Sequence, residues 1–190
     1  MKNITKKFGP VVANDKVNLE IYKGEILALL GENGSGKTTL MNMLSGIYFP
    51  DDGQIFINGK ETVIRSPKYA YACGIGMVHQ HFMLIQPFTV TENIILGLKK
   101  KDKLFGILPY VDLKKADQEI EALSKKYGLE VNPIDVIENT SVSTQQRVEI
   151  LKMLYREAEI LIFDEPTAVL TPQEIESLLT IIRNPRDHGK

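Results

Sequence analysis

The chain is poor in cysteine, net charge and long apolar runs, and each scarcity excludes a class of protein. Cys73 is the single cysteine in 190 residues, so no internal disulfide can form, which suits a reducing cytosol. The 23 basic and 24 acidic residues leave a net charge of −1, so no global field draws the chain onto nucleic acid or an anionic bilayer. No apolar run reaches the roughly 18 residues that a membrane-spanning helix needs. The N-terminus also lacks the apolar core of a signal peptide.

The remaining composition is that of a globular domain. Hydrophobic residues make up 43% of the chain, and a folded chain of this length removes roughly 70% of its unfolded surface from water. Residues 1–190 therefore predict one domain with a sizeable core.

A glycine-rich segment, residues 31–39, matches the pattern G-x-x-x-x-G-K-[ST] without a mismatch. The apolar run before it, Glu25–Leu30, predicts a strand, and residues 39–45 after it have helical composition and end at Gly46. Strand, glycine loop and helix are the setting that a phosphate-binding loop requires. The alternative is a glycine-rich turn that matches by coincidence.

Each part of this loop has a predicted task. Glycine backbone N–H groups and the positive end of the following helix form an anion nest. Lys37 would reach the β- and γ-phosphates, and the Thr38 hydroxyl would hold Mg²⁺. The residues predicted to bind the nucleotide here are Gly31, Asn33, Gly34, Ser35, Gly36, Lys37, Thr38 and Thr39.

A second motif consists of four apolar residues followed by two acids. The run Ile160–Phe163 predicts a strand buried on both faces, which ends in Asp164 and Glu165. Ligands of open α/β sheets bind at this edge. Asp164 would hold Mg²⁺, and Glu165 could act as the general base on the attacking water. Surface acids at a strand end are the simpler alternative.

The rest of the sequence predicts further strands and helices. The expected strands are Lys2–Phe8, Val17–Tyr22, Gln54–Asn58 and Gly74–His79. The expected helices are Thr91–Leu98, Asp112–Tyr127, Thr144–Glu157 and Pro172–Arg183. Four lysines around one aspartate, residues 99–103, predict a solvated loop. The predicted fold is an α/β nucleotide-binding core, residues 1–87 and 151–190, with a helical subdomain at 88–150.

Together these motifs resemble the nucleotide-binding domain of an ABC transporter, and almost the whole chain takes part. Phe8 matches the aromatic residue that stacks on adenine in that family, and Gln80 matches the glutamine that bridges Mg²⁺ and the transmembrane partner. Residues 166–171 match the loop after the catalytic glutamate. Within the family, residues 11–16, 76–84 and 168–174 are similar to the first ATP-binding domain of bacterial nucleoside importers, a branch close to the sugar importers.

The resemblance implies a P-loop core with an antiparallel β subdomain, ATP and Mg²⁺ as ligands, and ATP hydrolysis that powers solute import. It also implies several partners: a second ATP-binding domain in the same full-length chain or in a dimer, transmembrane permease subunits, and indirectly a solute-binding lipoprotein, with no nucleic acid. The apolar residues Phe82–Ile85 would line a groove for the membrane subunit. The implied location is peripheral, on the cytoplasmic face of the membrane.

Two departures from the family pattern are visible. The signature before Gln146 begins with Thr140 instead of leucine and has Ser143 in place of its central glycine. Ser141, which caps the γ-phosphate of a facing domain in the family, is retained, and Ser143 is itself a fair helix N-cap. The other departure is at the end. We expect a fragment that lacks the last core strand, so that His188 is not the family's switch histidine.

Other functions remain open at this stage. The altered signature favours a regulatory or structural module that binds nucleotide with little hydrolysis. A chromosome or repair ATPase would carry coiled-coil heptads or a cysteine pair in its insert, and neither is present. A small-molecule kinase would leave Gln80 and residues 145–147 unexplained. Sugar import is the alternative to nucleoside import.

Overall fold

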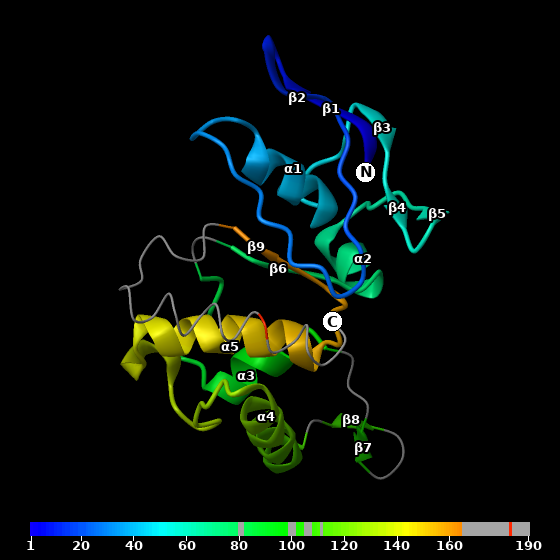
Figure 1. The fold of residues 1–190 in the computed structure, drawn as a ribbon. Coiled ribbons are helices and arrows are strands. Elements are labelled where there is room, and N and C mark those ends of the chain that lie inside the picture. The colour runs from blue at the N-terminus through cyan, green and yellow to red at the C-terminus, as the bar shows by residue number, and fades with distance from the viewer. Residues whose placement is uncertain (80–81, 99–101, 105–107, 111, 165–182, 184–190) are drawn as a thin grey trace. The chain divides into compact units, whose positions relative to one another are not determined.

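The structure is a computed structural model, and it describes residues 1–79, 82–98, 102–104, 108–110, 112–164 and 183. The chain divides into two compact units (Figure 1). Among the described residues, the first unit comprises Met1–Met77 and Ala158–Asp164, and the second comprises Val78–Glu157. The predicted subdomain boundaries at 88 and 150 remain a prediction.

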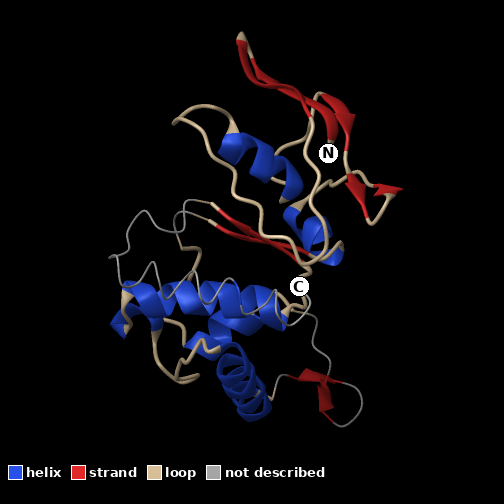
Figure 2. Ribbon diagram, viewed as in Figure 1, coloured by secondary structure: helices blue, strands red, loops and turns tan. Residues whose placement is uncertain are grey.

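An antiparallel sheet opens the first unit. Its strand order is β2-β1-β3, with β1 at Lys2–Phe8, β2 at Val11–Val17 and β3 at Asp52–Gln54. The β1–β2 hairpin aligns Phe8 with Val11, and β1 aligns Lys2 with Gln54 of β3. The sheet confirms the predicted strand Lys2–Phe8 and the antiparallel β subdomain (Figure 2).

The two strands predicted directly before the glycine loop, Val17–Tyr22 and Glu25–Leu30, are wrong. Residues 18–30 have no regular secondary structure apart from the turn at Lys23-Gly24. The apolar side chains of the segment Glu25–Leu30 are largely exposed, and Leu30 is 91% exposed. Leu19 pairs with Met1 through two backbone hydrogen bonds, but no ladder continues from them. A strand pattern becomes a strand only where it pairs with a neighbouring strand, and none of the described strands pairs with residues 18–30.

The glycine loop leads into α1, Lys37–Leu44, which confirms the predicted helix. The strand predicted at Gln54–Asn58 is divided between β3 and β4, Phe56–Ile57. Strand β4 forms a short hairpin with β5, Lys60–Glu61. Asn58 and Gly59 both have positive φ at the hairpin turn, which is the geometry that pairs short antiparallel strands. A short helix follows, α2 at Pro67–Ala72, capped by the Ser66 hydroxyl.

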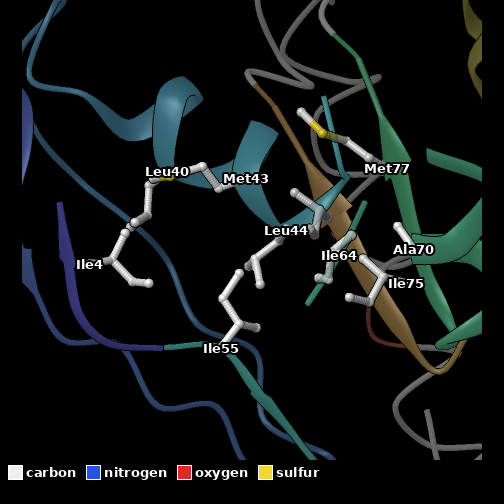
Figure 3. Close-up of a cluster of buried hydrophobic side chains, with 10 residues drawn as sticks. Ile4, Leu40, Met43, Leu44, Ile55, Ile64, Ala70, Ile75 and Met77 are labelled. Carbon is white, nitrogen blue, oxygen red and sulfur yellow. The ribbon is translucent and has the colours of Figure 1, made fainter. Parts of the chain in front are cut away.

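The first unit also contains β9, Ile160–Phe163, which forms a two-stranded sheet with β6, Ile75–Val78, a strand that lies in the first unit up to Met77. Both strands were predicted. All four residues of β6 are buried, whereas only Ile162 of β9 is buried, so the expected burial of β9 on both faces is wrong. Ile162, with Leu40 and Met43 of α1 and Ile75 of β6, belongs to one hydrophobic core (Figure 3). This core fixes the start of α1 relative to the end of β9.

The described part of the second unit contains three α-helices. They are α3 at Val90–Ile95, α4 at Leu113–Tyr127 and α5 at Val142–Tyr155, with a 3₁₀ turn at Ile137–Asn139 before α5. A small hairpin of β7, Asp102–Leu104, and β8, Leu108–Tyr110, precedes α4. The predicted helices Thr91–Leu98, Asp112–Tyr127 and Thr144–Glu157 are confirmed, with starts within two residues of the predicted ones. On α4, Ala116 and Ile120 are buried, whereas Leu113 is 45% exposed.

Several predictions fall outside the described residues. They concern Gln80, most of the lysine run at 99–103, Glu165 with the loop after it, the helix Pro172–Arg183, and His188.

Candidate nucleotide site

The glycine loop turns sharply where α1 begins. Gly36, the N-cap of α1, has φ +87°. A Cβ placed on it would lie 2.2 Å from the carbonyl oxygen of Ala13 in β2. The Asn14 side-chain amide, also from β2, donates to the Gly36 carbonyl at 3.3 Å. Only glycine fits here, because both the backbone angle and the space exclude a side chain.

Lys37 folds back over the loop that precedes it. Its ammonium group donates to the carbonyl oxygens of Gly31 and Glu32, each at 2.8 Å, and lies 3.4 Å from the Ser35 hydroxyl. The cation therefore lies inside the loop, at the N-terminal end of α1. Positive charge and free backbone N–H groups at a helix N-terminus suit a phosphate group.

Thr38 and Asp164 meet although 126 residues separate them. The Thr38 hydroxyl donates to Asp164 Oδ1 at 3.1 Å, directly after β9 ends at Phe163. Hydroxyl and carboxylate oxygens are the hard donors that Mg²⁺ prefers. The pair fits the predicted metal, and the structure brings the two predicted ligands together within one unit.

Phe8 lies at the end of β1 with 42% of its surface exposed. Its ring meets Tyr48 edge to face, with centroids 5.2 Å apart and planes at 71°, and the Lys6 ammonium lies 5.4 Å from the ring centre. The Phe8 ring is therefore not buried in the hydrophobic core, and it is held on one side by Tyr48. It retains an exposed surface on which a base could stack.

Ser141 belongs to the second unit and begins α5. Its hydroxyl accepts the Thr144 backbone N–H at 3.1 Å and lies 2.9 Å from the Thr144 hydroxyl. The helix begins at Val142, so the prediction of Ser143 as the N-cap is wrong. Ser141 has the extended backbone of a cap, and Ser143 already lies in the first turn.

Two supporting residues escaped the sequence analysis. Asn14 holds the Gly36 carbonyl, and Tyr48 packs on Phe8. Asn14 lies in the segment 11–16 that carries the family resemblance, but the contacts of both residues are tertiary, and no local spacing reveals them. Within the described part of the chain, no helix is both long and apolar enough to cross a membrane.

Comparison with known proteins places this geometry in a family. The model of a family described as ABC transporter matches residues 14–168. The nucleoside import ATP-binding protein NupA of Lactococcus lactis subsp. cremoris is 59% identical over all of this chain and 37% of its own length. The guanosine import ATP-binding protein NupO of Bacillus subtilis is 56% identical over all of this chain and 36% of its own length.

A solved structure extends the comparison to three dimensions. A dimeric ATP-binding cassette in a post-hydrolysis state, bound to ADP and Pi, has a TM-score of 0.79 and 28% identity over 100% of this chain and 83% of its own. The predicted fold is confirmed, and the chain spans a little over a third of the length of the curated relatives it matches. On this evidence the chain belongs to the ABC transporter family.

Proposed function

We propose that this chain binds and hydrolyses ATP as part of the subunit that powers a solute importer. The observation that carries the proposal is the meeting of Thr38 with Asp164 beside a glycine loop that already encloses the Lys37 ammonium. A hydroxyl, a carboxylate and a cation at one helix N-terminus are what a metal-bound triphosphate needs.

Each site residue has a proposed part. Backbone N–H groups of Gly34–Thr39 bind the phosphates, Lys37 neutralises the β- and γ-phosphate charge, and the exposed face of Phe8 carries the base. Thr38, Asp164 and Gln80 would hold Mg²⁺, which offsets the charge that develops on the transferred phosphoryl group. Glu165 accepts the proton of the attacking water, which Gln80 orients.

The proposed assembly places two such domains face to face. Ser141 at the start of α5 would cap the γ-phosphate bound by the facing domain, as the cap geometry of its hydroxyl allows. The dimeric cassette with ADP and Pi supports this arrangement. Residues 88–150 would form the helical subdomain that meets the permease subunits, at the cytoplasmic face of the membrane.

Nucleosides are the proposed cargo because the relatives at 59% and 56% identity are named for nucleoside and guanosine import. One observation favours a second function. Ser143 adds a side chain in the first turn of α5, where the family carries glycine, and this favours a module that binds nucleotide with little turnover.

The test uses the full-length protein reconstituted with its permease subunits and its solute-binding protein. Under the proposal, a nucleoside stimulates ATP hydrolysis, and the Glu165→Gln variant binds ATP but loses the stimulated rate by about 10²–10⁴-fold. Stimulation by ribose alone would reassign the cargo to sugars. ATP binding without hydrolysis in the wild type would favour the regulatory module.

A further inference from the structure

Helix α5 carries a buried charge that the proposed nucleotide chemistry does not use. Glu149 is 5% exposed, between two residues that are fully buried, Val148 and Ile150. Burying a carboxylate is costly unless hydrogen bonds or a counter-charge compensate. A group of this kind in the middle of a packed helix calls for a specific partner.

The partner is the backbone of Met83. Glu149 Oε1 accepts the Met83 N–H at 3.0 Å, and the Lys152 ammonium donates to the Met83 carbonyl oxygen at 3.3 Å. Glu149 Oε1 and Lys152 Nζ are 3.7 Å apart, and the side chains of Glu149 and Lys152 are 7% and 15% exposed. One turn of α5 therefore binds both polar backbone groups of a single residue, and charged groups form stronger hydrogen bonds than neutral ones.

The chain after Met83 is anchored a second time. Asn93 of α3, 1% exposed, accepts the Ile85 N–H at 2.7 Å and donates to the Ile85 carbonyl at 3.0 Å. The backbone of residues 86 and 88 also accepts hydrogen bonds from Glu138 and Ile137, each at 3.0 Å. The backbone is fixed while the Met83 side chain remains 64% exposed.

We infer that Glu149 is a positioning residue that ties the chain directly after Gln80 to the helix that Ser141 begins. Met83 lies three residues after Gln80 in the sequence, so the hydrogen bonds of Glu149 and Lys152 hold the chain that follows Gln80 to α5 at Met83. The inference rests on the proposed function, in which Gln80 orients water in one site and Ser141 caps the other. Phosphate binding depends on Lys37 and the glycine loop. The tie of Glu149 to Met83 therefore affects the turnover of ATP rather than the affinity for ATP.

The test compares two variants of the full-length protein by ATPase kinetics and by hydrogen exchange of the peptide that covers residues 82–88. In Glu149→Ala, exchange in this peptide rises, kcat falls about tenfold because a reacting group is misplaced, and KM for ATP stays within about twofold. In Glu149→Gln the side-chain oxygen still accepts the Met83 N–H, so kcat stays within about threefold of wild type.

A matched control comes from α4. Glu121→Ala removes the exposed pair between Lys125 Nζ and Glu121 Oε1, which are 2.7 Å apart within α4, and it should change neither the exchange nor the kinetic readout. If Glu149→Ala does not fold, Lys152→Met provides the same two readouts.

Unchanged exchange at residues 82–88, or equal damage in Glu149→Ala and Glu149→Gln, would overturn the inference. A wild-type protein that hydrolyses no ATP would refute the proposed function, while the exchange measurement would still decide whether the tie exists.

Discussion

Gly36 carries the tightest steric constraint in the phosphate loop, since its backbone angle and its distance to Ala13 both exclude a side chain. A left-handed backbone alone costs a non-glycine residue roughly 1–2 kcal/mol. Gly36→Ala should lower the free energy of unfolding by more than this amount and weaken ATP binding. Urea unfolding and calorimetry of the full-length protein measure the two effects.

Gly24→Ala is the matched control for this prediction. Gly24 has φ +77° but has open space where a Cβ would stand, so its substitution should cost about 1–2 kcal/mol and leave ATP affinity unchanged. Equal losses of stability in the two variants would show that the contact with Ala13 is not made.

Asp51 gives the protein a predictable response to acid. The hydrogen bond from the Lys6 ammonium at 2.9 Å, and then that from the Lys7 backbone N–H at 2.6 Å, lower the pKa of the Asp51 carboxyl below its ordinary value of 3.8. A lowered native pKa stabilises the fold above the unfolded value, and this stabilisation is lost as the pH falls through the native value.

The stability difference between wild type and Asp51→Asn should therefore be full at neutral pH and should shrink as the pH falls below 3.8. Urea unfolding at a series of pH values measures it. Asp52→Asn is the control, because the Asp52 carboxylate accepts the Gly53 N–H and not a lysine. A pH-independent difference for Asp51→Asn would contradict the assignment.

Residues that belong to motifs could be predicted from the sequence, whereas the residues that hold them in place could not. Lys37, Thr38 and Asp164 come together as their spacing and order along the chain suggested. The contact of Asn14 with Gly36 could not be predicted, because it depends on β2 passing beside a residue 22 positions further along the chain. A side chain selected by tertiary packing leaves no local pattern to detect.

At the scale of elements, two helix N-caps allow a structural role to be distinguished from a functional one. Ser141 caps α5 and Asp112 caps α4, each by accepting a backbone N–H at 3.1 Å. Replacing either residue by alanine should cost about 1 kcal/mol of unfolding free energy.

Only Ser141→Ala should also lower the ATPase rate of the reconstituted transporter, by about tenfold or more, because its hydroxyl would lose a contact with the γ-phosphate. Asp112→Ala, measured alongside, accounts for any loss that comes from stability alone. Similar rates in the two variants would leave Ser141 as a cap without a catalytic part.

Helices were easier to predict than strands because a helix satisfies its own backbone. The pattern of residues 113–127, with an aspartate before and a glycine after, was enough to predict α4. Residues 25–30 have an equally clear strand pattern, yet they form no strand, since pairing with a neighbour must come from elsewhere in the fold. The predicted start of α5, Thr144, is two residues too late because Ser141 and Ser143 are both possible N-caps. The extended backbone of Ser141 makes it the N-cap in the structure.

At the scale of the whole molecule, the residues with proposed parts fall in both compact units. Lys37, Thr38 and Asp164 belong to the first unit, and Ser141 and the Glu149 tie belong to the second. The proposal thereby assigns nucleotide binding to the first unit and the contact with a facing domain to the second.

Calorimetric titration of Mg-ATP into the full-length protein tests the central claim most directly, with Lys37→Ala titrated in parallel. The account predicts saturable binding to the wild type that needs Mg²⁺, weakened by about ten- to hundredfold in Lys37→Ala through loss of charged hydrogen bonds to phosphate. A folded wild-type protein without affinity for Mg-ATP, or equal affinity in the two proteins, would contradict it.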